Sequence, residues 1–455
     1  MKELDKDMTF ASRDEFRREP VADQLISLLR SEIEISPLVI DGDWGTGKTE
    51  FCTKLKNKLE STSDFRAVYI DAFKADHADD PLMTILSAIL SLVDGGEKEN
   101  LRKKALPVLR FGAKVAGKAL VSHFLRTDPE TLAADFSQEL DKASDDFIDS
   151  AVRTILKDHE EAEANINALQ DTLASIAEEK PIVIFIDELD RCRPDFAVQM
   201  LELIKHTFDV TGVQFVLVTN MKQLTSAVHH AYGVGEDAKR YLEKFIKFRC
   251  VLPERFNQSG DSYSKEREAS IEHLRAKLSA SKTLEGTKIA GTQNRVAQFA
   301  EELSSNRELS LREVETFVRH LEIYHQLTQG LSDRQHFGYT LISIFAVFVY
   351  CFDAELTRLI LTRNLREENL SAGLGLIRVD DFESRDFFQS PISIIAYFIC
   401  RDIEGSTAAA EPPGDYRDSV AQIGQSLFGP WGIDEGQAIE TLRDAIVAFS
   451  LGAST

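Results

Sequence analysis

The sequence predicts an α/β core with a parallel sheet, followed by regions that are mainly helical. Short apolar runs rich in Val, Ile and Phe alternate with helical patterns as far as about residue 252, which is typical of βα units that form a parallel sheet. One of these runs leads into a glycine-rich loop, and another ends in two acidic residues. Beyond about residue 256 helical patterns dominate to the end of the printed sequence.

Composition limits the classes of function. The 455 residues leave room for about two to four domains, and 43% hydrophobic and 28% charged residues are ordinary for a soluble globular protein. A net charge of −22 disfavours a general nucleic-acid ligand, because phosphate backbones attract basic surfaces. The scattered cysteines predict free thiols in a reducing compartment, with neither zinc nor disulfides; they are Cys52, Cys192, Cys250, Cys351 and Cys400.

Targeting and membrane signals are weak. Residues 1–7 are charged and contain no apolar segment of the kind that a signal peptide needs. The longest uncharged runs, 337–352 and 387–400, are shorter than the ~20 apolar residues of a membrane-spanning helix. We therefore expect two buried core helices in a cytoplasmic protein.

The glycine-rich loop matches the phosphate-binding pattern G-x-x-x-x-G-K-[ST]. An apolar run at 37–40 precedes it and a helical pattern at 51–56 follows it, as the pattern requires. Glycines let the backbone bring several N–H donors close to phosphate oxygens. The predicted nucleotide contacts are Gly42, Asp43, Trp44, Gly45, Thr46, Gly47, Lys48, Thr49 and Glu50.

Two side chains of this loop have chemical roles. Lys48 supplies a positive charge to the β- and γ-phosphates, and the hydroxyl of Thr49 binds Mg²⁺. The N-terminus of the following helix adds its partial positive charge.

The apolar run 181–186 ends in Asp187 and Glu188 and reads as a fully buried strand. Ligands of open α/β sheets bind just outside the carboxyl ends of the strands. Asp187 is therefore predicted to hold Mg²⁺, and Glu188 to polarise the attacking water as general base.

Further elements complete the core. We expect strands at 65–73, 213–220 and 248–252, and helices within 11–32 and at 81–92, 196–208 and 238–246. At the end of the second of these strands, Asn220 either contacts the γ-phosphate or its water, or caps the next helix. Residues 220–223 are not the N-K-x-D sequence that selects guanine, which leaves adenine as the expected base.

A helical insertion separates the two nucleotide motifs. From Lys48 to Asp187 the separation is 139 residues, more than one or two βαβ units of ~30 residues need, and residues 94–180 read as helical. Within it, the segment 101–126 has no acidic residue. This basic amphipathic segment either lies on an anionic membrane surface or an acidic partner, or packs against the protein's own acidic surface.

The ordered set of motifs resembles the KAP family of P-loop NTPases over roughly residues 15–325. The segments that carry the resemblance are 42–49, 68–73, 186–192, 218–220, 241–246 and 311–314. The resemblance implies an ASCE-type ATPase core at 1–255, followed by a helical lid at 256–330. Residues 331–455, which carry no resemblance, are expected to form a helical C-terminal domain.

The resemblance also implies functional properties. Family members are often membrane-associated through helices between the two nucleotide motifs, although no run in this insertion is long enough to span a bilayer. Some members look like signalling scaffolds and some bacterial members act in phage exclusion. An arginine finger would be Arg240 and a lid sensor Arg312, or each is a surface or structural residue. If Arg240 acts on a neighbouring copy, the protein forms homo-oligomers. Asp190 and Arg191 are expected to form a local ion pair.

We therefore expect an ATP- and Mg²⁺-dependent hydrolase that acts as a switch or assembly factor, with a protein partner that supplies any effector chemistry. The alternative is a nucleotide-gated scaffold with little turnover. A small-molecule kinase is a third, weaker interpretation, because no acceptor site is evident.

Overall fold

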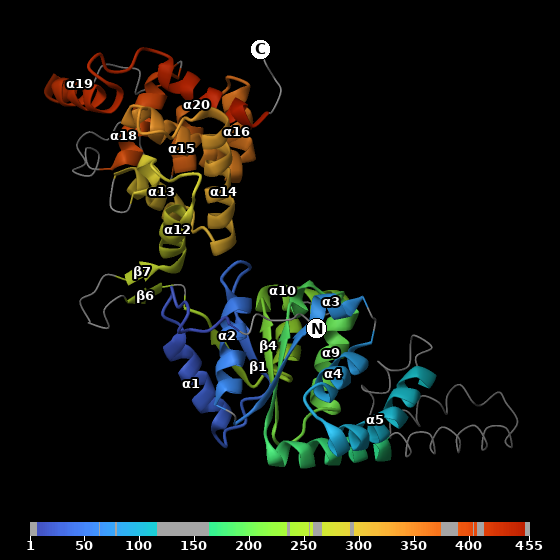
Figure 1. The fold of residues 1–455 in the computed structure, drawn as a ribbon. Helices are drawn as coiled ribbons and strands as arrows, with labels where there is room; N and C mark the ends of the chain where they lie inside the picture. Colours follow the sequence, from blue (N-terminus) through green and yellow to red (C-terminus); the bar gives the residue numbers. More distant parts are fainter. Residues whose placement is uncertain are drawn as a thin grey trace, which may run out of the picture. The chain divides into compact units, whose positions relative to one another are not determined.

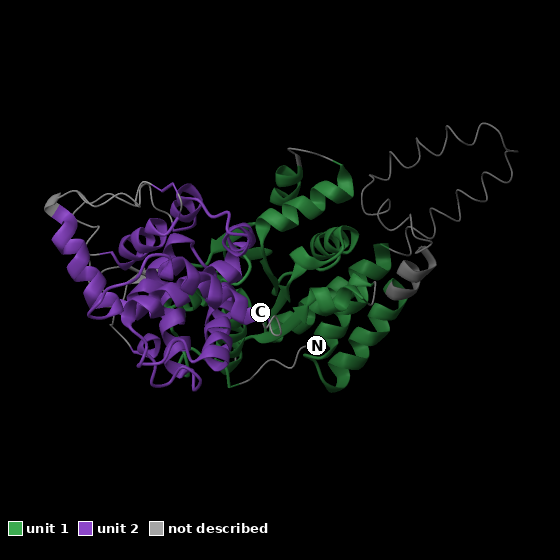
Figure 2. Cartoon of the chain, turned by 90° about the horizontal axis from the view of Figure 1, so that it is seen from above, with its two compact units in different colours: residues 1–253 green, residues 254–455 purple. Residues whose placement is uncertain are grey.

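The computed structural model describes residues 7–62, 64–77, 80–115, 163–233, 237–253, 255–257, 266–291, 295–374, 390–403, 405–406 and 414–450. By its internal contacts the chain divides into two compact units, residues 1–253 and 254–455 (Figure 2). Each unit is described by itself.

The first unit is built on a five-stranded parallel sheet in the order β2-β3-β4-β1-β5. Its strands are β1 (Leu38–Asp41), β2 (Arg66–Asp71), β3 (Ile182–Asp187), β4 (Val213–Thr219) and β5 (Phe248–Val251). Strand β4 lies between β1, which leads into the glycine-rich loop, and the acidic strand β3. An ASCE-type core, which the resemblance predicted, has such an additional strand between these two. The predicted α/β class is confirmed.

The register brings the ends of the strands together. Asp187 is paired with Asp71 on one side and with Val218 on the other, while Asp41 is paired with Thr219. Because all these strands run in the same direction, their carboxyl ends form one edge of the sheet. The glycine-rich loop and the acidic pair therefore meet at this edge.

Helices cover both faces of the sheet (Figure 1). One hydrophobic core joins Leu38 and Ile40 to α1 (Glu19–Arg30) and α2 (Lys48–Ser61), and a second joins Val39 to the other helices of the unit. Burial on both faces explains the continuous apolar runs of the strands. Other helices of this unit are α3 (Ala72–Asp76), α4 (Pro81–Leu90), α5 (Gly95–Val115), α9 (Pro194–His206), α10 (Met221–Tyr232) and α11 (Asp237–Glu243).

The described parts of the insertion are helical, as predicted: α5 and a helix over residues 163–179. Leu101, Ala105 and Val108 recur on one face of α5 and are buried in the second core. The basic residues 102–104 are exposed. The basic segment thus begins with one face packed against the protein, and its residues 116–126 lie outside the described residues.

The second unit is mainly helical. It begins with two short antiparallel strands, β6 (Arg255–Asn257) and β7 (Glu266–Glu268), which the sequence did not predict. The helices share one hydrophobic core that extends from Leu274 to Ile446. They are α12 (Ala269–Ala280), α13 (Arg295–Asn306), α14 (Leu311–Thr328), α15 (Phe337–Phe352), α16 (Ala354–Leu361), α17 (Glu367–Leu374), α18 (Pro391–Arg401), α19 (Gly414–Phe428) and α20 (Gln437–Val447).

The uncharged run 337–352 forms α15, and most of the described part of the run 387–400 lies in α18. The side chains of both helices are mostly buried in this core. The prediction of buried core helices is confirmed. Among the described residues, no helix combines the length and the apolar character that crossing a membrane would require.

Candidate nucleotide site

The glycine-rich loop has a backbone path that its glycines make feasible. Gly45 and Gly47 both have φ of 82°, in the left-handed region that residues with a Cβ rarely adopt. Gly47 is the N-cap of α2. A Cβ on Gly42 would lie 2.8 Å from Oγ1 of Thr46. The three glycines of the motif are thus each explained by local geometry.

The side chain of Lys48 makes hydrogen bonds within its own loop. Its Nζ donates hydrogen bonds to the carbonyl oxygens of Gly42, at 2.5 Å, and Asp43, at 2.9 Å. Burial lowers the pKa of Lys48, and the charges of nearby carboxylates, that of Asp190 first, act in the opposite direction. The Lys48 amino group is therefore held inside the loop by two carbonyl oxygens of the loop itself.

The two predicted metal ligands meet. Thr49 Oγ1 donates to Asp187 Oδ2 at 2.7 Å, although 138 residues separate them. The hydroxyl of Tyr69, on β2, donates to the same oxygen at 2.5 Å. Burial raises the pKa of Asp187, and the hydrogen bonds from Tyr69 and Thr49 and from the N–H of Glu188 oppose that rise.

Glu188 leaves the sheet in a strained conformation. Its φ is 60° and ψ 28°, a left-handed geometry uncommon for a residue with a side chain. Its N–H donates to Asp187 Oδ1 at 2.8 Å and to the carbonyl oxygen of Val218 at 3.2 Å. These bonds define the direction in which the chain turns at the edge of the sheet.

The short helix η1 (Leu189–Arg191) follows Glu188. Arg191 pairs with the Glu188 carboxylate at 3.3 Å. The expected ion pair between Asp190 and Arg191 is therefore wrong, because a 3₁₀ turn brings residues three apart to the same side. Asp190 instead accepts hydrogen bonds from Trp44 Nε1 at 2.7 Å and from Thr219 Oγ1 at 3.1 Å.

Asn220 links the loop to the next helix. Its Oδ1 accepts from the N–H groups of Lys222 and Gln223, so it caps α10 as one of the two interpretations expected. Its Nδ2 donates to Asp43 Oδ1 at 3.0 Å. Asp41 also connects these elements, by accepting from the Met221 N–H and from Arg249.

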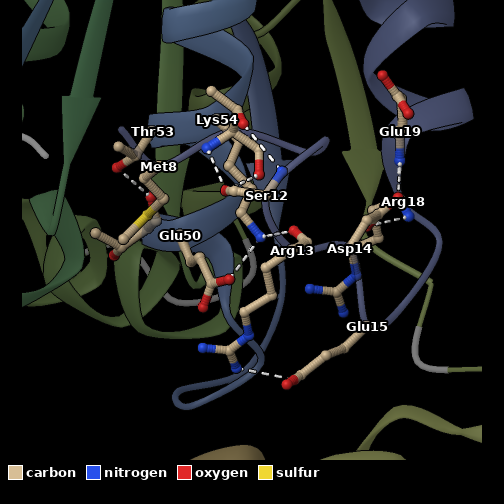
Figure 3. A network of polar contacts seen from close by, with 12 residues as sticks. Met8, Ser12, Arg13, Asp14, Glu15, Arg18, Glu19, Glu50, Thr53 and Lys54 are labelled. Atoms are coloured by element: carbon tan, nitrogen blue, oxygen red, sulfur yellow. Dashed lines mark hydrogen bonds and ion pairs between the residues drawn. The ribbon is translucent and has the colours of Figure 1, made fainter. Parts of the chain in front are cut away.

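Residues 8–18 pack on the loop and on α2 in a way that the sequence analysis missed (Figure 3). Arg18 is 4% exposed and donates to the carbonyl oxygens of Thr46, at 2.9 Å, and Pro253, at 3.0 Å. Lys54 donates to the carbonyl oxygen of Arg13 at 2.6 Å and to Glu50 at 2.7 Å. A narrow cleft adjoins this network and is lined by Phe10, Asp14, Glu15, Phe16, Arg18, Gly47, Glu50, Phe51 and Lys54.

The two predicted arginines are both exposed. Arg240 is exposed on α11, a helix held by Tyr241, whose hydroxyl donates to Glu202 on α9 at 3.0 Å. Arg312 is exposed in the first turn of α14, in the second unit. The roles of both arginines stay predictions.

Several known proteins are similar to this chain. Solved structures of the Caenorhabditis elegans protein PCH-2 and of the Aeropyrum pernix ORC2 protein in ADPNP and ADP complexes match with 11% and 13% identity and TM-scores of 0.30 and 0.33. The first match covers 73% of this chain and 68% of the other, and the second covers 96% and 95%. At these values neither likeness bears on function.

Among curated proteins, none matches. The model of the KAP family P-loop domain matches residues 18–328, more than half of the chain. The match includes the phosphate-binding loop, the acidic pair and the first helices of the second unit. The chain therefore belongs to the KAP family of P-loop NTPases.

Proposed function

We propose that this chain binds ATP with Mg²⁺ and hydrolyses it, and that it acts as a nucleotide-driven switch or assembly factor. The observation that carries this proposal is the meeting of Thr49 and Asp187, with Glu188 next in the chain, at the carboxyl edge of the sheet. This juxtaposition supports the proposal, because it brings the glycine-rich loop and the two acidic residues of β3 and its following turn to one edge of the sheet.

The oxygen donors fit Mg²⁺. This ion prefers hard oxygen ligands and is usually held by one or two protein groups together with substrate phosphates. Thr49 and Asp187 would hold it, and their oxygens already lie 2.7 Å apart. The ion would neutralise charge on the phosphates. Within the part of the chain that the structure describes, no cluster of three or more His, Cys, Asp or Glu side chains forms an alternative metal site.

Residues of the chain itself would bind the phosphates and activate the water. The N–H groups of the loop and the Lys48 ammonium bind the phosphates, and Glu188 accepts a hydrogen bond and then a proton from the attacking water. Arg191 pairs with the carboxylate of Glu188. For Glu188 to reach the water, its contact with Arg191 has to loosen.

The same ion pair favours a second candidate, a nucleotide-gated scaffold with little intrinsic turnover. If Arg191 keeps the Glu188 carboxylate engaged, ATP binds without being hydrolysed, and a partner protein would have to release the base. The hydrolase and the scaffold use the same nucleotide-binding residues and differ only in the rate of ATP hydrolysis.

Steady-state ATP hydrolysis by wild type, Lys48→Ala and Glu188→Gln separates the two candidates. We expect Lys48→Ala to lose ATP binding, and Glu188→Gln to keep binding while turnover falls about 100-fold or more, the range of a lost general base. Lys56→Ala and Glu60→Gln are matched controls, because these residues pair with each other on α2 outside the loop.

Full turnover by Glu188→Gln would show that the base is another group. Tight ATP binding by wild type without turnover would select the scaffold.

A further inference from the structure

Trp44 occupies a position where the phosphate-binding pattern accepts any residue. The residue is 48% exposed, so burial alone does not determine where the indole lies. The indole N–H donates to Asp190 Oδ2 at 2.7 Å across 146 residues of sequence. A short bond to a charged acceptor is among the stronger hydrogen bonds in proteins. Trp44 thus ties the phosphate-binding loop to the acidic turn.

Asp190 uses both carboxylate oxygens. Oδ1 accepts from the hydroxyl of Thr219, a fully buried residue at the end of β4, at 3.1 Å. One side chain therefore links three elements: the loop, the turn η1 and the central strand β4. Because Asp190 lies two residues after Glu188, a change in these contacts would move the backbone that carries the proposed base.

The turn that carries Glu188 is stabilised by its own ion pair with Arg191, and it is also joined to the rest of the unit on both sides. On its N-terminal side the Glu188 N–H bonds to Asp187 and Val218, as described above. On its C-terminal side the described contacts that join the turn to the loop are those of Asp190. Since Glu188 itself has a left-handed backbone conformation, loss of the contact between Trp44 and Asp190 would let this turn relax.

We propose that Trp44 and Asp190 are a positioning pair, through which the conformation of the phosphate-binding loop determines where the Glu188 carboxylate lies. Neither residue touches the reacting atoms in this proposal. The pair makes the general base depend on the state of the loop. This inference rests on the proposed function, because positioning a base matters only if the chain hydrolyses ATP.

The chain offers a built-in spectroscopic reporter. It has two tryptophans, Trp44 and Trp431, and Trp431 is 95% exposed in the second unit. Trp431→Phe leaves Trp44 as the single indole and is expected to leave turnover unchanged. In that background, Asp190→Asn is expected to shift the Trp44 emission without nucleotide, because the indole loses its charged acceptor.

Kinetics then test positioning in the same background. Trp44→Phe keeps an aromatic side chain but removes the indole N–H, and Asp190→Asn removes the charge. We expect each to lower kcat about 10- to 100-fold, the scale of a misplaced catalytic group. The Kd for ATP should change less than about threefold, because the backbone N–H groups of the loop and Lys48, rather than the Trp44 side chain, bind the phosphates. In a double-mutant cycle, the double variant should be no slower than the slower single variant, because both remove one interaction.

Additive losses in the cycle, or weaker ATP binding with unchanged kcat, would overturn the proposal. If Asp190→Asn does not fold, Trp44→Phe decides alone: an unchanged kcat refutes the pair, and a lowered kcat with unchanged Kd supports it. Absence of turnover in wild type would instead refute the proposed function, so the two failures are distinguishable.

Discussion

At the scale of single residues, two basic side chains stabilise the phosphate-binding loop by donating hydrogen bonds to its carbonyl oxygens. Lys48 binds those of Gly42 and Asp43, and Arg18 binds that of Thr46. Since N–H and C=O of a peptide are fixed in one plane, holding the carbonyls also limits where the N–H groups point. Arg18 is thus a structural partner of the loop although it precedes the motif by more than twenty residues.

Arg18→Lys should weaken both folding and ATP binding. Lysine keeps the charge but lacks the planar fork that reaches the carbonyl oxygens of Thr46 and Pro253 together. Leaving a buried acceptor unsatisfied costs about 1–3 kcal/mol. Urea unfolding measures the stability, and titration with ATP measures the affinity. The exposed neighbour Arg17, changed to lysine, is the control, and an Arg18→Lys protein indistinguishable from it would contradict this role.

The residues of the motifs could be predicted because their chemistry follows from local spacing. Tyr69 and Arg18 could not. A tyrosine in an apolar run has the pattern of a core residue, and its bond to Asp187 spans 118 residues. The bond between Trp44 and Asp190 depends likewise on the order of the strands, which the sequence does not state.

At the scale of elements, the positions of the apolar strands in the sequence could be predicted, but which strands lie side by side in the sheet could not. Runs such as 182–187 are continuous because the sheet is buried on both faces. The strands β6 and β7 flank a polar stretch of the sequence and could not be predicted, because three-residue strands give no periodic signal. The order β2-β3-β4-β1-β5 follows from packing between distant segments.

A pH-dependent contact joins α12 to α14. Glu315 accepts from Lys277 and His273, and these hydrogen bonds, that of Lys277 first, lower the pKa of Glu315. A carboxyl group whose folded pKa is depressed stabilises the fold above its unfolded pKa, and this stability is lost as pH falls through the folded pKa. Because the Glu315 side chain is 43% exposed, screening limits the contribution to about 1 kcal/mol or less.

Glu315→Gln tests this contact. The variant should be less stable than wild type at pH 7, and the difference should shrink as the pH falls from about 5 to 3. Urea midpoints at each pH measure it. Glu285→Gln, at an exposed position between α12 and α13, is the control, and a pH-independent difference for Glu315→Gln would show that the contact does not depend on charge.

At the scale of the whole molecule, the family match crosses the boundary between the two units. It ends at residue 328, in α14, whereas the first unit ends at residue 253. Helices inside and outside the match share one core: Phe317 on α14 packs against Phe348 and Phe352 on α15. Helix α14 thus couples the part of the chain typical of the family to the part that is not.

The proposed homo-oligomer can be tested through Arg240, which we propose acts on the nucleotide of a neighbouring copy. Such a cation stabilises the charge that develops on the γ-phosphate, an effect of about 10³-fold or more in P-loop enzymes. Arg240→Ala should therefore lower turnover strongly, whereas Lys239→Ala, at the adjacent exposed position on α11, should not.

Mixing variants shows whether the action is between copies. Glu188→Gln chains lack the base but carry Arg240, and Arg240→Ala chains carry the base, so a mixed oligomer contains interfaces where both groups meet. We expect turnover to reappear on mixing, and turnover per wild-type chain to rise with protein concentration because assembly precedes hydrolysis. If Arg240 acts within its own chain, the mixture stays as inactive as its parts, and if it is only a surface residue, Arg240→Ala hydrolyses ATP as fast as Lys239→Ala.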